Sequence, residues 1–146
     1  DKAETVRKSA AVALGRIAHQ DAIDALIKAL DDTHFSVRYS ATGSLIKIGK
    51  ESGEVLEERF DQLPKMAQYY AIDVWAGLEY EDAFDKLKDL LKSEDNRLRG
   101  FAIVAIARIK PDKTAKLLRK YSKVEKNPFV QSSFDKAHRI AAEEKE

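Results

Sequence analysis

The sequence lacks cysteine, a long non-polar run and any large excess of one charge. Without cysteine it can form no disulfide framework, no thiol-based active site and no cysteine-built zinc site. No non-polar run reaches the roughly 18 residues that span a membrane. The 26 basic and 25 acidic residues leave a formal net charge of +1, which provides no general attraction to nucleic acid or to an anionic membrane. These absences favour a reducing, cytoplasmic compartment and predict no membrane partner.

The beginning of the chain also lacks two common signals. It has no signal peptide, and it starts at Asp1 rather than at methionine. The first residues open directly on a repeated segment. This start is compatible with a fragment of a larger protein or with a processed form.

Motifs that carry catalysis are missing as well. The sequence has no phosphate-binding glycine loop, no nucleophile elbow and no paired metal-binding motif. Residues 49–53, GKESG, contain two glycines without the spacing of a nucleotide-binding loop, and they predict a turn. We therefore predict no catalytic residue, no metal site, no cofactor and no enzymatic activity.

What the sequence does contain is a repeat. The segment TVRKSAAVALGRI at residues 5–17 has related copies that begin at Val37, Ala67, Leu98 and Val130. Counted from Val6, successive copies are 30 to 32 residues apart, and a period of about 30 residues is typical of a solenoid. One helical face of the first copy carries a non-polar stripe, which we expect to pack between helices. Its members are Val6, Ala10, Ala13, Leu14 and Ile17.

Each copy predicts a helical hairpin. A short turn follows the first helix, and the second helix has its own non-polar stripe, such as Ile23, Leu26, Ile27 and Leu30. The expected caps at helix starts are Asp1, Asp21 and Asp32. The predicted hairpins cover residues 1–31, 32–62, 63–93 and 94–125. A terminal helix at residues 127–146 follows, and we expect residues 1–146 to form one domain.

The aligned pattern is D-x4-V-R-x2-A-x3-L, followed by A-I-x2-L-I-x-A-L. It is carried by Asp1, Val6, Arg7, Ala10, Leu14 and Ile17, by Asp32, Val37, Arg38, Ala41, Leu45 and Ile48, and by residues 22–30. This pattern resembles HEAT repeats, most closely the phycobilisome-lyase HEAT-like subtype, over nearly the whole chain. It is weaker in the third hairpin, where Gln68 replaces the arginine. The resemblance implies an all-α solenoid, a right-handed superhelix of about four and a half hairpins.

In such arrays the arginine after the valine usually contacts caps and carbonyl groups between neighbouring hairpins. The resemblance therefore implies that Arg7, Arg38 and Arg99 form a structural ladder, which we call the arginine ladder. A role of these arginines in binding a partner is the alternative.

Enzymes with similar repeats provide a test of catalysis. Deoxyhypusine hydroxylase binds two irons through adjacent His-Glu pairs, but His19, His34 and His138 are followed by Gln, Phe and Arg. A bilin lyase activity is not implied, because the subtype occurs widely outside the lyases. A HEAT-like alkylpurine DNA glycosylase would need Trp and Asp together, whereas Asp73 and Trp75 point about 200° apart on a helix. We expect Trp75 in the core and Asp73 in solvent.

The resemblance also implies a groove, lined by the second helix of each hairpin, that binds a protein or peptide. The residues expected to line it are Asp24, Lys28, Glu54, Glu58, Asp85, Asp89, Lys116, Arg119 and Lys120. They make the groove acidic in the second and third hairpins and basic in the fourth. This polarity would orient a partner of opposite pattern. The alternative is a solvated face that keeps the solenoid in solution.

Tyr39 and Tyr69 occupy equivalent positions in the second and third copies. They would form an exposed aromatic stripe with a separation of about 10 Å if both face outwards. Exposed tyrosines are common interface anchors. Packing against neighbouring helices, or against another part of a longer protein, is an equal alternative.

The first functional hypothesis is a non-catalytic scaffold for a partner protein or peptide. The alternatives are a regulatory or substrate-positioning domain of a larger enzyme and, less favoured by the charge balance, a nucleic-acid-binding domain. The sequence identifies neither the partner nor the oligomeric state.

Overall fold

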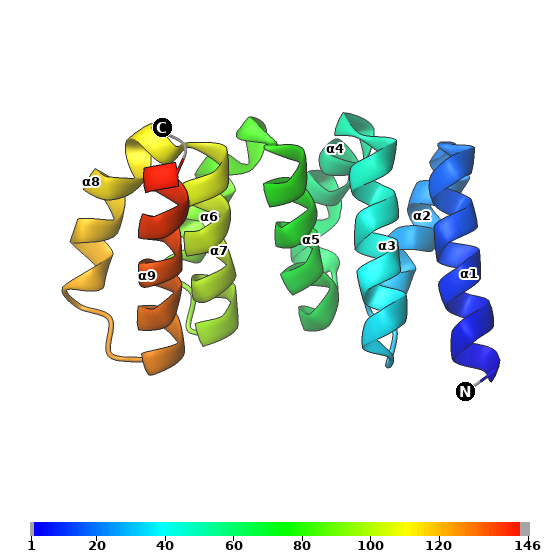
Figure 1. Cartoon of the computed structure of the whole chain (residues 1–146), viewed down its shortest axis with the longest axis horizontal. Coiled ribbons are helices and arrows are strands. Elements are labelled where there is room, and N and C mark those ends of the chain that lie inside the picture. Colours follow the sequence, from blue (N-terminus) through cyan, green and yellow to red (C-terminus); the bar gives the residue numbers. More distant parts are fainter. Residues whose placement is uncertain (1, 144–146) are drawn as a thin grey trace. The chain divides into compact units, whose positions relative to one another are not determined.

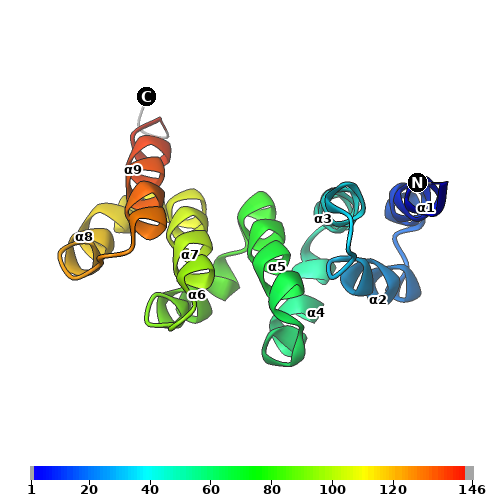
Figure 2. The same cartoon turned by 90° about the horizontal axis from the view of Figure 1, so that it is seen from below.

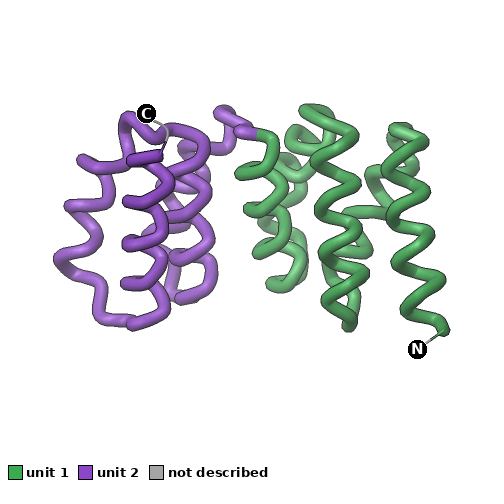
Figure 3. Tube along the Cα trace, viewed as in Figure 1, with its two compact units in different colours: residues 1–78 green, residues 79–146 purple. Residues whose placement is uncertain are grey.

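The computed structural model describes residues 2–143. Within them the protein has nine α-helices, two short 3-10 turns and no strand (Figure 1). Successive helices form hairpins, and the predicted all-α solenoid is confirmed. The chain divides into two compact units, residues 1–78 and residues 79–146 (Figure 3). Two expectations depend on how the units are arranged: that the chain forms one domain, and that its hairpins form a right-handed superhelix. Both remain predictions.

Unit 1 contains two hairpins and the first helix of the third. Its helices are α1 (Lys2–Ile17), α2 (Gln20–Ala29), α3 (Phe35–Ile48), α4 (Lys50–Arg59) and α5 (Lys65–Leu78). Helix α3 packs between α1 and α5, while α2 and α4 lie on the other side of this layer (Figure 2). First helices therefore form one layer of unit 1 and second helices the other.

Unit 2 begins with the second helix of the third hairpin. Its helices are α6 (Phe84–Leu90), α7 (Asn96–Ile109), α8 (Pro111–Ser122) and α9 (Pro128–Glu143). Helix α9 packs along α7 and also contacts α8. Its first turn is capped by Asn127, whose Oδ1 accepts hydrogen bonds from the N–H groups of Phe129 and Val130.

Each unit has a continuous non-polar core. In unit 1 the Trp75 ring stacks on Phe60 at a centroid distance of 5.0 Å, and its indole N–H donates to the Gly53 carbonyl at 3.2 Å. The predicted core position of Trp75 is confirmed by its complete burial. The other fully buried large side chains of unit 1 are Ile23, Leu26, Leu30, Leu45, Leu56 and Ile72, and those of unit 2 are Leu87, Ile103, Ile106 and Leu118.

The stripe expected to pack in α1 is a wrong prediction. Val6 and Ile17 are 67% and 62% exposed, whereas the equivalent Val37 and Leu98 are buried. In unit 1, α3 packs against both helices of the preceding hairpin, α1 and α2, and in unit 2, α7 packs against α6. No hairpin precedes α1 within the described residues. Helix α1 instead buries Ala11 and, through close contact with α3, Gly15.

Two local predictions also need correction. The turn expected at residues 49–53 reduces to Gly49, whose φ of 105° favours glycine, because α4 begins at Lys50. Asp21 and Asp32 are not the residues before their helices; His19 and His34 occupy those positions. The Asp32 carboxylate is used elsewhere, since it accepts from the His34 N–H and from Arg7. The expected cap Asp1 lies outside the described residues.

Two helical glycines differ sharply in the space around them. A Cβ on Gly15 would lie 2.5 Å from the Ser44 Oγ and 3.1 Å from its Cα. The Ser44 hydroxyl is held there because it donates to the Ala11 carbonyl at 2.8 Å. A Cβ on Gly43 would meet no atom within 4 Å. Gly15 therefore permits the close contact of α1 with α3, whereas Gly43 has no such packing role.

We expect Gly15→Ala to lower the free energy of unfolding by about 1 to 2 kcal/mol, because α1 must move away from α3. Gly43→Ala is the matched control and should raise it by about 0.5 to 1 kcal/mol, through the higher helix propensity of alanine. Urea unfolding followed by circular dichroism measures both changes. An equal stabilisation by the two substitutions would disprove the packing role of Gly15.

Candidate functional site

The connection before a first helix is held by an arginine in that helix. Arg38 donates from one guanidinium nitrogen to the carbonyls of Asp32 at 2.7 Å and Thr33 at 3.0 Å. Arg99 donates in the same way to the carbonyls of Ser93 at 2.8 Å and Glu94 at 3.2 Å. These carbonyls belong to the connection that follows the preceding second helix, so a charged donor satisfies acceptors that take part in no helical hydrogen bond.

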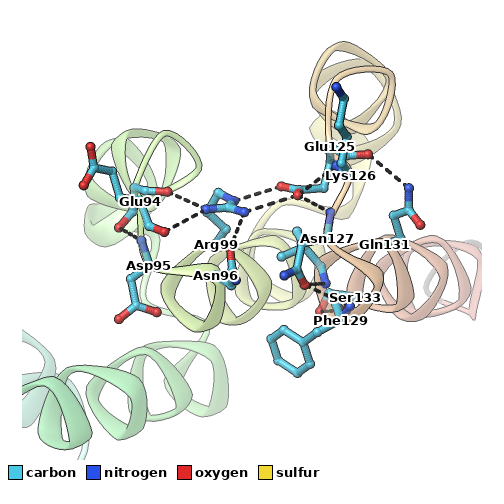
Figure 4. A network of polar contacts seen from close by, with 12 residues as sticks. Glu94, Asp95, Asn96, Arg99, Glu125, Lys126, Asn127, Phe129, Gln131 and Ser133 are labelled. Carbon is cyan, nitrogen blue, oxygen red and sulfur yellow. Dashed lines mark hydrogen bonds and ion pairs between the residues drawn. The ribbon is translucent and has the colours of Figure 1, made fainter.

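Two arginines of the ladder also bind a carboxylate in the connection that follows their hairpin. Arg99 donates to both oxygens of Glu125 at 2.8 and 3.2 Å (Figure 4). Arg7 makes the equivalent paired contact with Asp32 at 2.7 and 3.2 Å. Arg38 has no such carboxylate and instead lies over the Tyr70 ring, 5.3 Å from its centroid. Among the three arginines, Arg99 therefore links the connections before and after its hairpin, whereas Arg7 holds only the following connection and Arg38 only the preceding one.

Gln68 replaces the arginine in the third hairpin and keeps part of this bonding. Its buried amide nitrogen donates to the Phe60 carbonyl at 2.8 Å. The sequence analysis noted the loss of the arginine but missed this hydrogen bond. Its position in the repeat was the available signal, because glutamine is a shorter donor that can reach a carbonyl from the same place.

The ladder arginines keep their carboxylate partners ionised. The hydrogen bond from Arg7 is the main cause that lowers the pKa of Asp32 from 3.8 to about 2, and the His34 N–H adds to it. The hydrogen bond from Arg99 likewise lowers the pKa of Glu125, with help from the backbone N–H groups of Asn127 and Lys126. Both carboxylates accept several donors in the folded state, which favours their charged form.

The described residues offer no group of three or more His, Asp or Glu side chains that could hold a metal ion. Over the same part of the chain, no helix is both long and non-polar enough to cross a membrane.

The nine residues predicted to line the groove are all exposed on second helices, four in unit 1 and five in unit 2. We call the set in each unit, taken by itself, its second-helix surface. Several of the carboxylates have cationic partners. Asp24 pairs with Arg59 at 2.8 Å, and the Asp85 carboxylate lies 2.6 Å from Lys88. Glu54 lies 3.6 Å from Lys50, one helical turn away. The acidic character predicted for the second and third hairpins is therefore partly neutralised.

The basic part of the surface in unit 2 differs, because Lys116 and Lys120 have no carboxylate partner among residues 2–143. They border a hollow of about 430 Å³ between α6 and α8 of unit 2. Its non-polar lining comes from Phe84 and Leu117. A second hollow of about 450 Å³ lies in unit 1 beside the exposed stripe of α1 and reaches Lys28.

Of the two alternatives given for Tyr39 and Tyr69, the exposed aromatic stripe is excluded, because Tyr69 is 9% exposed and is packed against its neighbours. It belongs to a helix, α5, on which residues of nearly every face are buried. Tyr39 is 67% exposed and pairs with Phe35, itself 61% exposed, at a centroid distance of 5.8 Å. The exposed aromatic pair therefore lies along one helix, α3, and includes a phenylalanine that the sequence analysis missed.

Comparison with known proteins identifies the family. Residues 1–65 and 54–137 match a family model described as HEAT repeats. The chain belongs to the HEAT-repeat family. HEAT repeats commonly mediate protein–protein interactions and generally act as non-catalytic scaffolds. The chain is also similar to the uncharacterized phycocyanin operon protein Y of Pseudanabaena tenuis (strain PCC 7409), with 29% identity over 109 residues. The match covers 73% of this HEAT-repeat chain and 26% of that relative, so it spans about a quarter of the relative's length.

We expect Arg99→Ala to lower the free energy of unfolding by about 2 to 3 kcal/mol, because it leaves a partly buried Glu125 and two carbonyls without their charged donor. Arg108→Ala, on the exposed side of the same helix, should change it by less than about 0.5 kcal/mol. Urea unfolding measures both variants. Equal losses of unfolding free energy in the two variants would show that the hydrogen bonds of Arg99 do not stabilise the connection.

The depressed pKa of Asp32 predicts a pH-dependent contribution to stability. Protonation favours the unfolded chain, because the folded pKa of about 2 lies below the ordinary 3.8. The contribution is therefore complete above the ordinary pKa and is lost as the pH falls through the folded pKa. We expect Asp32→Asn to cost about 1 kcal/mol at neutral pH, a value reduced for solvent screening, and progressively less below pH 4.

Urea unfolding at a series of pH values tests this prediction. Asp31→Asn is the control, because Asp31 is the exposed neighbour of Asp32. A difference between wild type and Asp32→Asn that stays constant down to the lowest pH would contradict the assignment.

Proposed function

We propose that this protein is a non-catalytic scaffold that binds a partner protein or peptide through a second-helix surface. The observation that carries the proposal is the division of α2, α4, α6 and α8 into two faces. One face is completely buried, as in Leu26, Leu56, Leu87 and Leu118, and the other presents the nine charged residues to solvent.

The charges of this surface are not needed to hold the fold together. Exposed ion pairs such as Asp24 with Arg59 contribute only about 0.2 to 1 kcal/mol each. The connections are instead held by the arginine ladder, whose guanidinium groups donate to carbonyls and to Asp32 and Glu125. The second-helix surface is thus available for a partner, which supports binding as its role.

The similarity to a phycocyanin operon protein supports placing the chain in the phycobilisome-lyase HEAT-like subtype that the repeat pattern suggests. A scaffold role does not depend on this placement. The nine residues and their exposure are properties of the chain itself.

Site-specific photo-crosslinking tests the proposal. A photoreactive amino acid at Glu58 or Asp89 places the crosslinker on the second-helix surface, and one at Lys47 or Arg108 places it on exposed first-helix positions as the matched control. In an extract of the cells that make the protein, we expect the same protein to be crosslinked from the second-helix positions and not from the controls. Mass spectrometry identifies the adduct.

The identified partner is then purified and its affinity is measured. Charge reversal at Glu58 and Asp89 should weaken binding, whereas reversal at Lys47 and Arg108 should leave the affinity unchanged. Two outcomes would reject the second-helix surface as the binding site. One is crosslinking from the first-helix controls alone, and the other is an affinity that stays unchanged after charge reversal at Glu58 and Asp89.

A further inference from the structure

The hollow between α6 and α8 combines a non-polar lining with a rim of lysines. Phe84 and Leu117 line it, both half-buried, and together with the methylene chains of the lysines they make most of its surface non-polar. Four lysines and one acid surround these side chains: Lys88, Lys113, Lys116, Lys120 and Asp112. A volume of about 430 Å³ is enough for one large side chain of a partner.

The lysines differ in how far they are already engaged. Lys88 is bound to Asp85, and its ammonium nitrogen lies 5.0 Å from the Phe84 ring centroid. The Lys113 ammonium lies 5.7 Å from the same centroid and has no carboxylate within 4.0 Å in the described part of the chain, but its charge helps to lower the pKa of Asp85. Lys116 and Lys120 are exposed and free of carboxylates there, and the Lys120 ammonium lies 5.8 Å from the Tyr121 ring centroid. Three cations at the rim are therefore without a direct carboxylate partner in the described part of the chain, and Lys116 is the least engaged of them.

Their arrangement follows from the helix. Lys113, Lys116, Leu117 and Lys120 have the spacing i, i+3, i+4 and i+7 and so share one face of α8, while Thr114 and Leu118 are buried on the other. Helix α8 carries four basic residues and only one acid, Asp112, although the whole chain has a formal net charge of +1. The positive charge is a local property of this face.

We propose that the α6–α8 hollow binds an acidic peptide segment of a partner protein that carries one large non-polar side chain. That side chain occupies the space over Phe84 and Leu117, and the flanking carboxylates pair with Lys113, Lys116 and Lys120. The proposal rests on the proposed function and specifies the chemistry of the partner. The non-polar contact provides an anchor and the ion pairs select for acidic neighbours.

A nucleic acid fits this face less well. Asp85, Asp89 and Asp112 lie on the same two helices and oppose a phosphate backbone and peptide carboxylates alike, so the non-polar lining of Phe84 and Leu117 is what distinguishes the two ligands. A single hollow with a non-polar lining also matches one inserted side chain better than a row of phosphates. Binding of an oligonucleotide is therefore an outcome that would contradict the proposal.

Fluorescence anisotropy with the full chain tests it. The probe is a labelled ten-residue peptide of alternating Glu and Asp with Phe-Leu at its centre. One comparison peptide has Ala-Ala at the centre, a second has lysines in place of the acids, and a third probe is oligo-dT. We expect the first peptide to bind about tenfold more tightly than the others, a difference of about 1.4 kcal/mol, and to weaken as salt rises.

Variants assign the binding to the hollow. Lys116→Glu with Lys120→Glu should weaken the acidic peptide at least about tenfold, because two attractions become repulsions. Arg108→Glu with Lys136→Glu changes the net charge equally at exposed residues that do not line the hollow, and should change the affinity by less than about twofold. Phe84→Ala should reduce the difference in affinity between the acidic peptide with Phe-Leu at its centre and the one with Ala-Ala.

Circular dichroism and the urea midpoint show whether each variant is folded. If the double reversal unfolds α8, Lys116→Gln with Lys120→Gln replaces it, with an expected weakening of about threefold. Equal binding of the Phe-Leu and Ala-Ala peptides, no loss in the lysine variants, or tighter binding of oligo-dT would each overturn the proposal. A partner crosslinked at Glu58 or Asp89 that binds through a basic segment would overturn it too, while leaving the proposed function intact.

Discussion

This structure depends on one interaction: the hydrogen bonds that an arginine near the start of a first helix donates to carbonyl groups of the preceding connection. Arg38 and Arg99 each donate to two carbonyls of the preceding connection, and Arg99 also holds Glu125 of the next. A connection that follows a helix end has carbonyls without helical partners, and leaving them unpaired in a tight turn is costly. One planar, permanently charged donor with several N–H groups satisfies them and fixes the path of the chain between hairpins.

Because arginines of the first helices hold the connections, the exposed faces of the second helices are not required for this purpose. Their buried faces, represented by Leu26 and Leu118, contribute to the cores, and the arginines maintain the connections from the first-helix side. Exposed ion pairs on the second helices contribute little to the stability of the fold. On α6 the carboxylate of Asp85 is occupied by Lys88, but on α8 the lysines remain available, which concentrates unpaired charge at one hollow.

The third hairpin shows how far the repeat can depart from its pattern. Gln68 keeps a hydrogen bond to a carbonyl with a shorter, neutral side chain, and Trp75 fills a core position where the first, second and fourth copies have leucine or isoleucine. Tyr69 is buried although its equivalent Tyr39 is exposed. Equivalent positions in a repeat share a backbone direction, but burial depends on which neighbours each helix has.

The sequence by itself determined the repeat, the helices and the position of the arginine ladder. A period of about 30 residues and non-polar positions three and four apart leave few alternatives to stacked helical hairpins. Only the tertiary structure decided that Val6 is exposed and Val37 buried, because covering a stripe requires a neighbouring helix. It likewise decided that Asp85 is paired and Lys116 is not, since ion pairs depend on distances between side chains that a pattern of residue types does not contain.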